Sequence, residues 1–90
     1  MTFSTLSDFT STNRVECGDL SHTQYLAQVS DKVVSLAVFD DEEEYGFGVS
    51  LNTSSFVPGS MEEGTSWDDT LIECTVSSTL ESALKVVNRF

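Results

Sequence analysis

Two apolar segments that lie close together in the sequence limit the fold more than any other feature. From Tyr45 to Leu51, large apolar residues alternate with glycine and serine, which is the pattern of a strand with one buried face. The segment from Val33 to Phe39 is apolar and rich in β-branched residues, which is typical of a strand buried on both faces. Only the acidic residues from Asp40 to Glu44 separate the two segments. The pair therefore predicts a β-hairpin with an acidic tip.

Three shorter segments extend this prediction. Residues 72–76 alternate between apolar and polar side chains, so they predict a strand with a polar outer face. Residues 25–29 also alternate and favour a strand, although the same residues fit a helix. Ser30 and Asp31 would then turn the chain back toward Val33. Residues 14–17 indicate a further short strand.

A helix is predicted at the C-terminal end. Ser78, followed three residues later by Glu81, has the pattern of a capping box. Four apolar residues then recur at the spacing of one helix face: Leu80, Ala83, Leu84 and Val87. Near the N-terminus, Phe3, Leu6 and Phe9 favour a short helical turn. The predicted fold class is α+β, with an antiparallel sheet of about four strands, the C-terminal helix packed on one face and a short N-terminal helix.

Length and composition favour a single folded domain over residues 1–90. A chain of this length has apolar surface for one modest core, and its nine aromatic residues bury a large area each. Residues 1–13 lack the basic start and continuous apolar run of a secretory signal, and no segment approaches the roughly 20 apolar residues of a membrane span. We therefore expect a cytoplasmic protein, in the host cytoplasm if the chain is viral, that does not contact membranes.

The sequence has no pattern that indicates catalysis or metal binding. Cys17 and Cys74 match no zinc spacing and are expected to be buried as small apolar side chains, with a disulfide as the less favoured alternative. The single histidine, His22, is expected at the surface, where a Ser-His-Asp scheme has no further support. Residues 40–44 lack the ligand spacing and the glycine of a calcium loop. We therefore expect no enzyme activity, no cofactor and no metal.

Two glycines lie in the second segment of the predicted hairpin. Gly46 and Gly48 do not have the spacing of a phosphate-binding loop, and their surroundings are acidic. We expect them to let a helix or another backbone approach the strand closely.

The charge of the chain restricts its partners. Fifteen acidic residues against four basic ones give a formal net charge of −11. No basic residue lies between Lys32 and Lys85, whereas ten acids lie there. These are Asp40, Asp41, Glu42, Glu43, Glu44, Glu62, Glu63, Asp68, Asp69 and Glu73. The interval predicts an uncompensated negative surface that repels nucleic acid and anionic membranes and attracts basic proteins.

Clustering of the acids favours a binding surface over adaptation to high salt, which would spread them over every face. In an extended strand, Asp40, Glu42 and Glu44 would follow one another at about 6.7 Å, comparable to successive phosphates. Trp67 is either a core residue or an aromatic anchor of the interface. The predicted partner-binding residues are Asp40, Asp41, Glu42, Glu43, Glu44, Glu62, Glu63, Trp67, Asp68 and Asp69.

These observations favour a non-enzymatic inhibitor that mimics nucleic acid and occupies the basic groove of a nucleic-acid-handling protein. Small acidic inhibitors of restriction, CRISPR and repair enzymes, mostly encoded by phages, resemble this chain in size and charge alone. The expected partner is a basic protein that binds nucleic acid, and the chain is expected to be a monomer or homodimer. The alternative is a small accessory or regulatory subunit, homodimeric through a sheet edge, whose acidity serves solubility.

Overall fold

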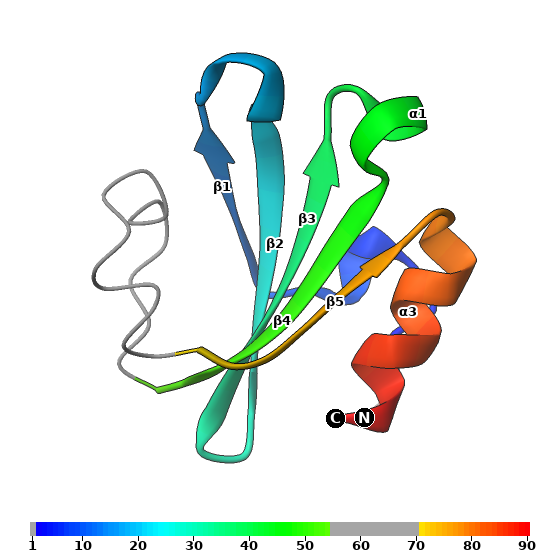
Figure 1. Cartoon of the computed structure of the whole chain (residues 1–90). Coiled ribbons are helices and arrows are strands. Elements are labelled where there is room, and N and C mark those ends of the chain that lie inside the picture. The colour runs from blue at the N-terminus through cyan, green and yellow to red at the C-terminus, as the bar shows by residue number, and fades with distance from the viewer. Residues whose placement is uncertain (1, 55–70) are drawn as a thin grey trace.

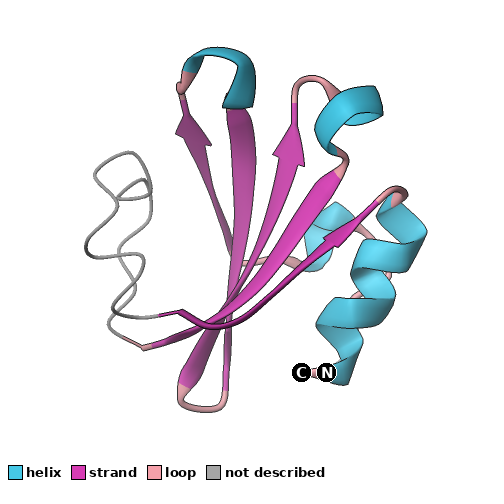
Figure 2. Ribbon diagram, in the orientation of Figure 1, coloured by secondary structure: helices cyan, strands magenta, loops and turns pink. Residues whose placement is uncertain are grey.

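The computed structural model describes residues 2–54 and 71–90. Within them, five antiparallel strands form one sheet in the order β1-β2-β3-β4-β5 (Figure 1). The strands are β1 (Ser11–Val15), β2 (His22–Val29), β3 (Lys32–Phe39), β4 (Phe47–Thr53) and β5 (Leu71–Ser77). The helical elements are the 3-10 turns η1 (Leu6–Asp8) and η2 (Gly18–Leu20), the single turn α1 (Glu42–Tyr45) and the helix α3 (Leu80–Arg89) (Figure 2). The predicted α+β class, with a helix on one face of an antiparallel sheet, is confirmed.

The predicted hairpin forms between β3 and β4. Val38 lies opposite Phe47 and Leu36 opposite Val49, so these four apolar residues share one face of the sheet. Strand β4 begins two residues later than expected, because Tyr45 ends α1 and Gly46 turns the chain. The strand predicted at residues 25–29 is the longer β2, and Ser30 makes the turn to β3 with a φ of 57°.

The first strand, β1, brings the number of strands in the sheet to five. It begins and ends earlier in the sequence than the short strand expected at residues 14–17. Its first four residues are polar, and only its last residue, Val15, is apolar and buried. The strand is held by its register with β2, in which Ser11 lies opposite Leu26 and Val15 opposite His22. Pairing with a neighbour, rather than an apolar alternation of its own, therefore defines β1.

One face of the sheet packs against α3 and the N-terminal segment to form the core. The core consists of Phe3, Phe9, Ala27, Val34, Leu36, Phe47, Val49, Ala83, Leu84, Val86 and Val87. Asn88 of α3 fastens the N-terminal segment, because its side chain accepts a hydrogen bond from the Phe3 amide (2.7 Å) and donates one to the Phe3 carbonyl (2.9 Å). The predicted short helical turn near the N-terminus is η1.

The N-cap of α3 differs from the prediction by one residue. Thr79 has extended backbone angles, and its hydroxyl accepts a hydrogen bond from the Ser82 amide at 3.1 Å. Ser78 precedes this cap, so the expected capping box of Ser78 with Glu81 does not form. The apolar stripe is as predicted, since Ala83, Leu84 and Val87 are buried and Leu80 packs against the core.

The expectations for the cysteines and the histidine are wrong. Cys17 and Cys74 are exposed and free, because Cys17 lies in the connection after β1 and Cys74 lies on the outer strand β5. His22 is buried, with only 1% of its surface exposed. It lies at the start of β2, where its Nδ1 is 2.7 Å from the Leu20 carbonyl oxygen and its ring packs against that of Phe39 at an angle of 49°.

In the described part of the chain, no helix is long and apolar enough to cross a membrane.

Candidate functional site: an acidic end of the sheet

Sheet topology gathers acidic residues at one end of the molecule. In a sheet whose strands follow one another in order, the connections β1–β2 and β3–β4 lie at the same end, as Figure 1 shows for the turn after β1 and for α1. Seven exposed carboxylates lie in or beside these connections. They are Glu16, Asp19, Asp40, Asp41, Glu42, Glu43 and Glu44, and this set is called the acidic end.

The helical turn α1 presents the centre of the acidic end. The Asp41 carboxylate accepts a hydrogen bond from the Glu44 amide at 3.2 Å, so Asp41 caps the N-terminus of the turn. The Tyr45 amide donates to the Asp41 carbonyl (3.0 Å) and the Gly46 amide to the Glu42 carbonyl (2.9 Å). Carboxylates in the first turn also suit the positive end of the helix dipole. These local interactions explain why the acidic run forms a helical turn at Glu42, Glu43 and Glu44 instead of an extended tip.

Gly46 fixes α1 against the end of β5. Its φ is 70°, which a side chain disfavours, and a Cβ at this position would lie 2.4 Å from the Ser77 carbonyl oxygen. The expected close approach of another backbone is therefore confirmed at Gly46. At Gly48 a Cβ would meet only side-chain atoms, the nearest being in the Phe39 ring at 3.6 Å. The acidic turn is thus held at a defined place, next to the last residues of β5.

Arg14 is the cation within the acidic end. Its guanidinium donates to both carboxylate oxygens of Asp40, and its Nε donates to Glu16 at 2.9 Å. Hydrogen bonds to Asp40 and then Glu16 raise the pKa of Arg14, and the hydrogen bond from Arg14 lowers the pKa of Asp40. The expectation of an uncompensated surface is therefore wrong for Asp40, because antiparallel pairing brings Arg14 of β1 to the end of β3.

The ion pair predicts a pH dependence that Asp40→Asn should remove. Arg14 holds the pKa of Asp40 below its ordinary value of 3.8 in the folded protein. A folded-state pKa below the unfolded one means that the stabilisation is present above about pH 4 and is lost as the pH falls through the folded value. We expect the unfolding free energy of the Asp40→Asn variant to fall less steeply below about pH 4 than that of the parent. Urea unfolding at several pH values measures this, and equal slopes would contradict the assignment.

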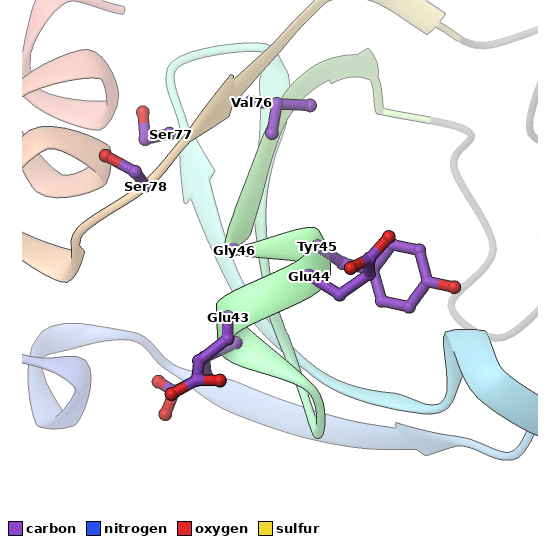
Figure 3. Close-up of a pocket in the computed structure, with 8 residues that line it drawn as sticks. Glu43, Glu44, Tyr45, Gly46, Val76, Ser77 and Ser78 are labelled. Carbon is purple, nitrogen blue, oxygen red and sulfur yellow. The ribbon is translucent and has the colours of Figure 1, made fainter.

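Two open hollows flank α1, and both are lined by carboxylates. The first, of about 390 Å³, lies between residues 42–46, the end of β5 at Val76 and Ser77, and the following Ser78 (Figure 3). The second, of about 630 Å³, is lined by Gly18, Asp19, Asp40, Asp41, Glu44 and Tyr45. Figure 3 shows the side chains of Glu43 and Glu44 pointing to different sides of α1. The arrangement therefore offers negative charge over a rounded surface and not along one line.

Three aromatic rings pack in a row beneath the acidic end, those of His22, Phe39 and Tyr45. The ring of His22 lies 5.0 Å from that of Phe39, and the ring of Phe39 lies 5.8 Å from that of Tyr45, measured between centroids. The Asp40 amide also donates to the Ser21 carbonyl at 3.1 Å, which ties the end of β3 to the segment before β2. These contacts hold α1 and η2 on a packed base.

The structure brings together the first five predicted partner-binding residues, Asp40 to Glu44, but not in the expected extended row. Glu42, Glu43 and Glu44 lie on a helical turn, because the Asp41 cap and the Gly46 turn favour that conformation. The remaining predicted residues lie outside the described residues; these are Glu62, Glu63, Trp67, Asp68 and Asp69.

Sequence reasoning missed Glu16, Asp19 and Arg14, because it counted charge along the chain and not across the sheet. The strand order would have placed the connection after β1 beside the acidic run. The described residues contain no group of three or more histidine, cysteine or acidic side chains placed to hold a metal ion. No protein family, curated protein or solved structure compared with this chain matches it.

Proposed function

We propose that this protein is a non-enzymatic inhibitor that places its acidic end in the nucleic-acid-binding groove of a basic protein in the cytoplasm. The observation that carries the proposal is the gathering of seven exposed carboxylates from two neighbouring connections, of which Arg14 pairs with only two, Glu16 and Asp40. Folding does not require such a cluster, since like charges repel one another and destabilise the compact state. Binding to a cationic surface offsets this repulsion.

The way α1 is held supports a binding role for the acidic end. The Asp41 cap and the close approach of Gly46 to Ser77 hold the backbone of α1 in place before any partner arrives. A turn whose backbone is already ordered loses less conformational entropy on binding than a flexible loop does. The carboxylates are exposed, so they act at a distance and accelerate association with a basic groove.

Competition with nucleic acid tests this function. The immobilised protein is expected to capture basic nucleic-acid-binding proteins from a cell lysate at low salt and to release them when duplex or single-stranded DNA is added in excess. Purified captured protein then serves as the probe for kinetics. If excess nucleic acid of either kind fails to displace it, mimicry is wrong and the accessory-subunit alternative replaces it.

We expect the double variant Glu42→Gln with Glu44→Gln to associate with the captured protein about three to ten times more slowly, with little change in dissociation, because exposed charges act mainly on the association rate. Added salt should slow the parent protein in the same way. The control, Asp31→Asn with Glu81→Gln, removes the same net charge outside the acidic end. Surface plasmon resonance measures both rates. Equal association rates for the two double variants would mean that overall charge alone matters.

A further inference from the structure

The strand β5 is an edge strand of the sheet formed by the described residues. In the described part of the chain, β5 pairs with β4 on one side only, and four of its residues are exposed. The unpaired backbone groups of an edge strand are a template for another strand, and proteins commonly protect such edges with lysine or proline. Strand β5 has neither, and its only charged residue is Glu73. The other edge, β1, carries the Arg14 ion pairs.

Apolar side chains lie exposed along this edge. Val76 and Ile72 are 70% and 48% exposed, which is unusual for β-branched apolar residues. Val76 lies opposite Gly48, and Cys74 lies opposite Ser50, so both are on the face of the sheet away from α3. The edge therefore combines backbone groups that pair with no further described strand and apolar side chains that are exposed at the margin of the face away from α3.

A small apolar groove adjoins this surface. It measures about 180 Å³, and its lining includes Ala37, Phe39, Gly48, Cys74 and Val76. The groove exists because Ala37 and Gly48 are paired across β3 and β4, and neither fills the space between the larger side chains. Partial burial raises the pKa of the Cys74 thiol, in agreement with an apolar setting. The groove has the size to accept one aliphatic side chain.

Val76 connects the groove to the acidic end. The same residue lines the hollow beside α1 that is bounded by Glu42, Glu43 and Glu44 (Figure 3). Strand β5 runs toward this hollow, since Ser77 lies opposite Phe47 at the end where β4 begins. An extended segment advances about 3.4 Å per residue, so side chains on one face are about 7 Å apart. A strand laid on β5 would therefore meet the apolar groove and, within a few residues, the carboxylates.

We propose that the edge of β5 binds an extended basic segment of the partner protein by β-strand addition. The segment pairs antiparallel with β5, places an apolar side chain in the groove and brings lysine or arginine at its N-terminal end to Glu42, Glu43 and Glu44. Charge favours this occupant over a second copy, which would bring a further −11. This inference rests on the proposed function, because it names the part of the partner that the acidic end recognises.

Synthetic peptides test the inference. The probe has two arginines followed by alternating valine and threonine; a second peptide has the arginines at its C-terminal end, and a third replaces valine with serine. We expect the first to bind about fivefold more tightly than either control, as one ion pair or one buried aliphatic side chain is worth about that factor. Amide chemical shifts of the isotope-labelled protein should change along β5 and α1. Methylating the peptide amides that face β5 should abolish binding, whereas methylating the alternate amides should not.

Two variants distinguish the contribution of the groove to peptide binding from that of the rest of β5. Val76→Thr keeps a β-branched residue but replaces an apolar group that lines the groove with a hydroxyl. It should lower the affinity for the first peptide about fivefold. Ile72→Thr makes a similar change on the same strand outside the groove, and it should weaken binding less than about twofold. Amide spectra of both variants show whether the fold is retained.

The outcomes distinguish this inference from the proposed function. If all three peptides bind with equal affinity and change only the amide chemical shifts of the acidic end, the proposed site on β5 is wrong. Docking driven by charge at the acidic end would then remain supported. If no basic peptide binds and nucleic acid fails in competition, the proposed function is also wrong. If sedimentation shows a dimer that Val76→Thr dissociates, the edge belongs to a second copy and the inference is overturned.

Discussion

The variant Leu84→Ala is expected to lose about 2 to 4 kcal/mol of unfolding free energy. Leu84 lies on the buried face of α3, within the cluster that includes Leu36 and Val49 of the sheet. Truncation removes buried apolar surface and leaves a cavity that the surrounding sheet fills only in part. Because the domain has one modest core, a loss of this size is a large part of its total stability.

Urea unfolding followed by circular dichroism measures this loss, and Glu43→Gln is the matched control. Glu43 is exposed on α1, at the acidic end, so its neutralisation should leave the unfolding free energy nearly unchanged. Equal shifts of the two midpoints would show that the division between a structural helix and a functional acidic end is wrong.

The sequence predicted the parts of the fold that depend on local pattern. The hairpin of β3 and β4, the strand β5 and the apolar face of α3 each have their own periodicity, and each element is present. The polar outer face predicted for β5 is wrong, because Cys74 and Val76 are exposed and Thr75 lies opposite the core residue Val49. Strand β1 has no such pattern, so only its pairing with β2 reveals it. The burial of His22 was likewise beyond sequence reasoning, because it depends on the Leu20 carbonyl and the Phe39 ring at positions fixed by the tertiary fold.

The sequence predicted most of the acidic residues of the candidate site but not their arrangement. The acidic run at residues 40–44 was evident from composition, but its shape was not recognised. Asp41 followed three residues later by Glu44 has the capping pattern that marks a helical start, and this signal was available in the sequence. The contribution of Asp19 and the pairing of Arg14 with Asp40 needed the strand order, because residues far apart in the chain meet only when the sheet is assembled.

Gly46→Ala is expected to destabilise the protein by about 2 to 4 kcal/mol, an effect comparable to a core truncation. Two separate costs combine at this position. The φ of 70° is unfavourable for alanine, and the new Cβ would lie 2.4 Å from the Ser77 carbonyl oxygen, a backbone atom that cannot rotate away. The backbone must therefore move, either at α1 or at the end of β5.

Two further alanine variants divide these costs. Gly18→Ala also places alanine at a positive φ, 57°, but its Cβ meets nothing within 4 Å, so we expect a loss of about 1 kcal/mol. Gly48→Ala makes only ordinary contacts with Phe39 and Ala37, so it should be close to neutral. Thermal and urea unfolding of the three variants gives the comparison. If Gly46→Ala costs no more than Gly18→Ala, the contact with Ser77 does not fix α1, and the acidic end is not held in the arrangement on which partner recognition is proposed to depend.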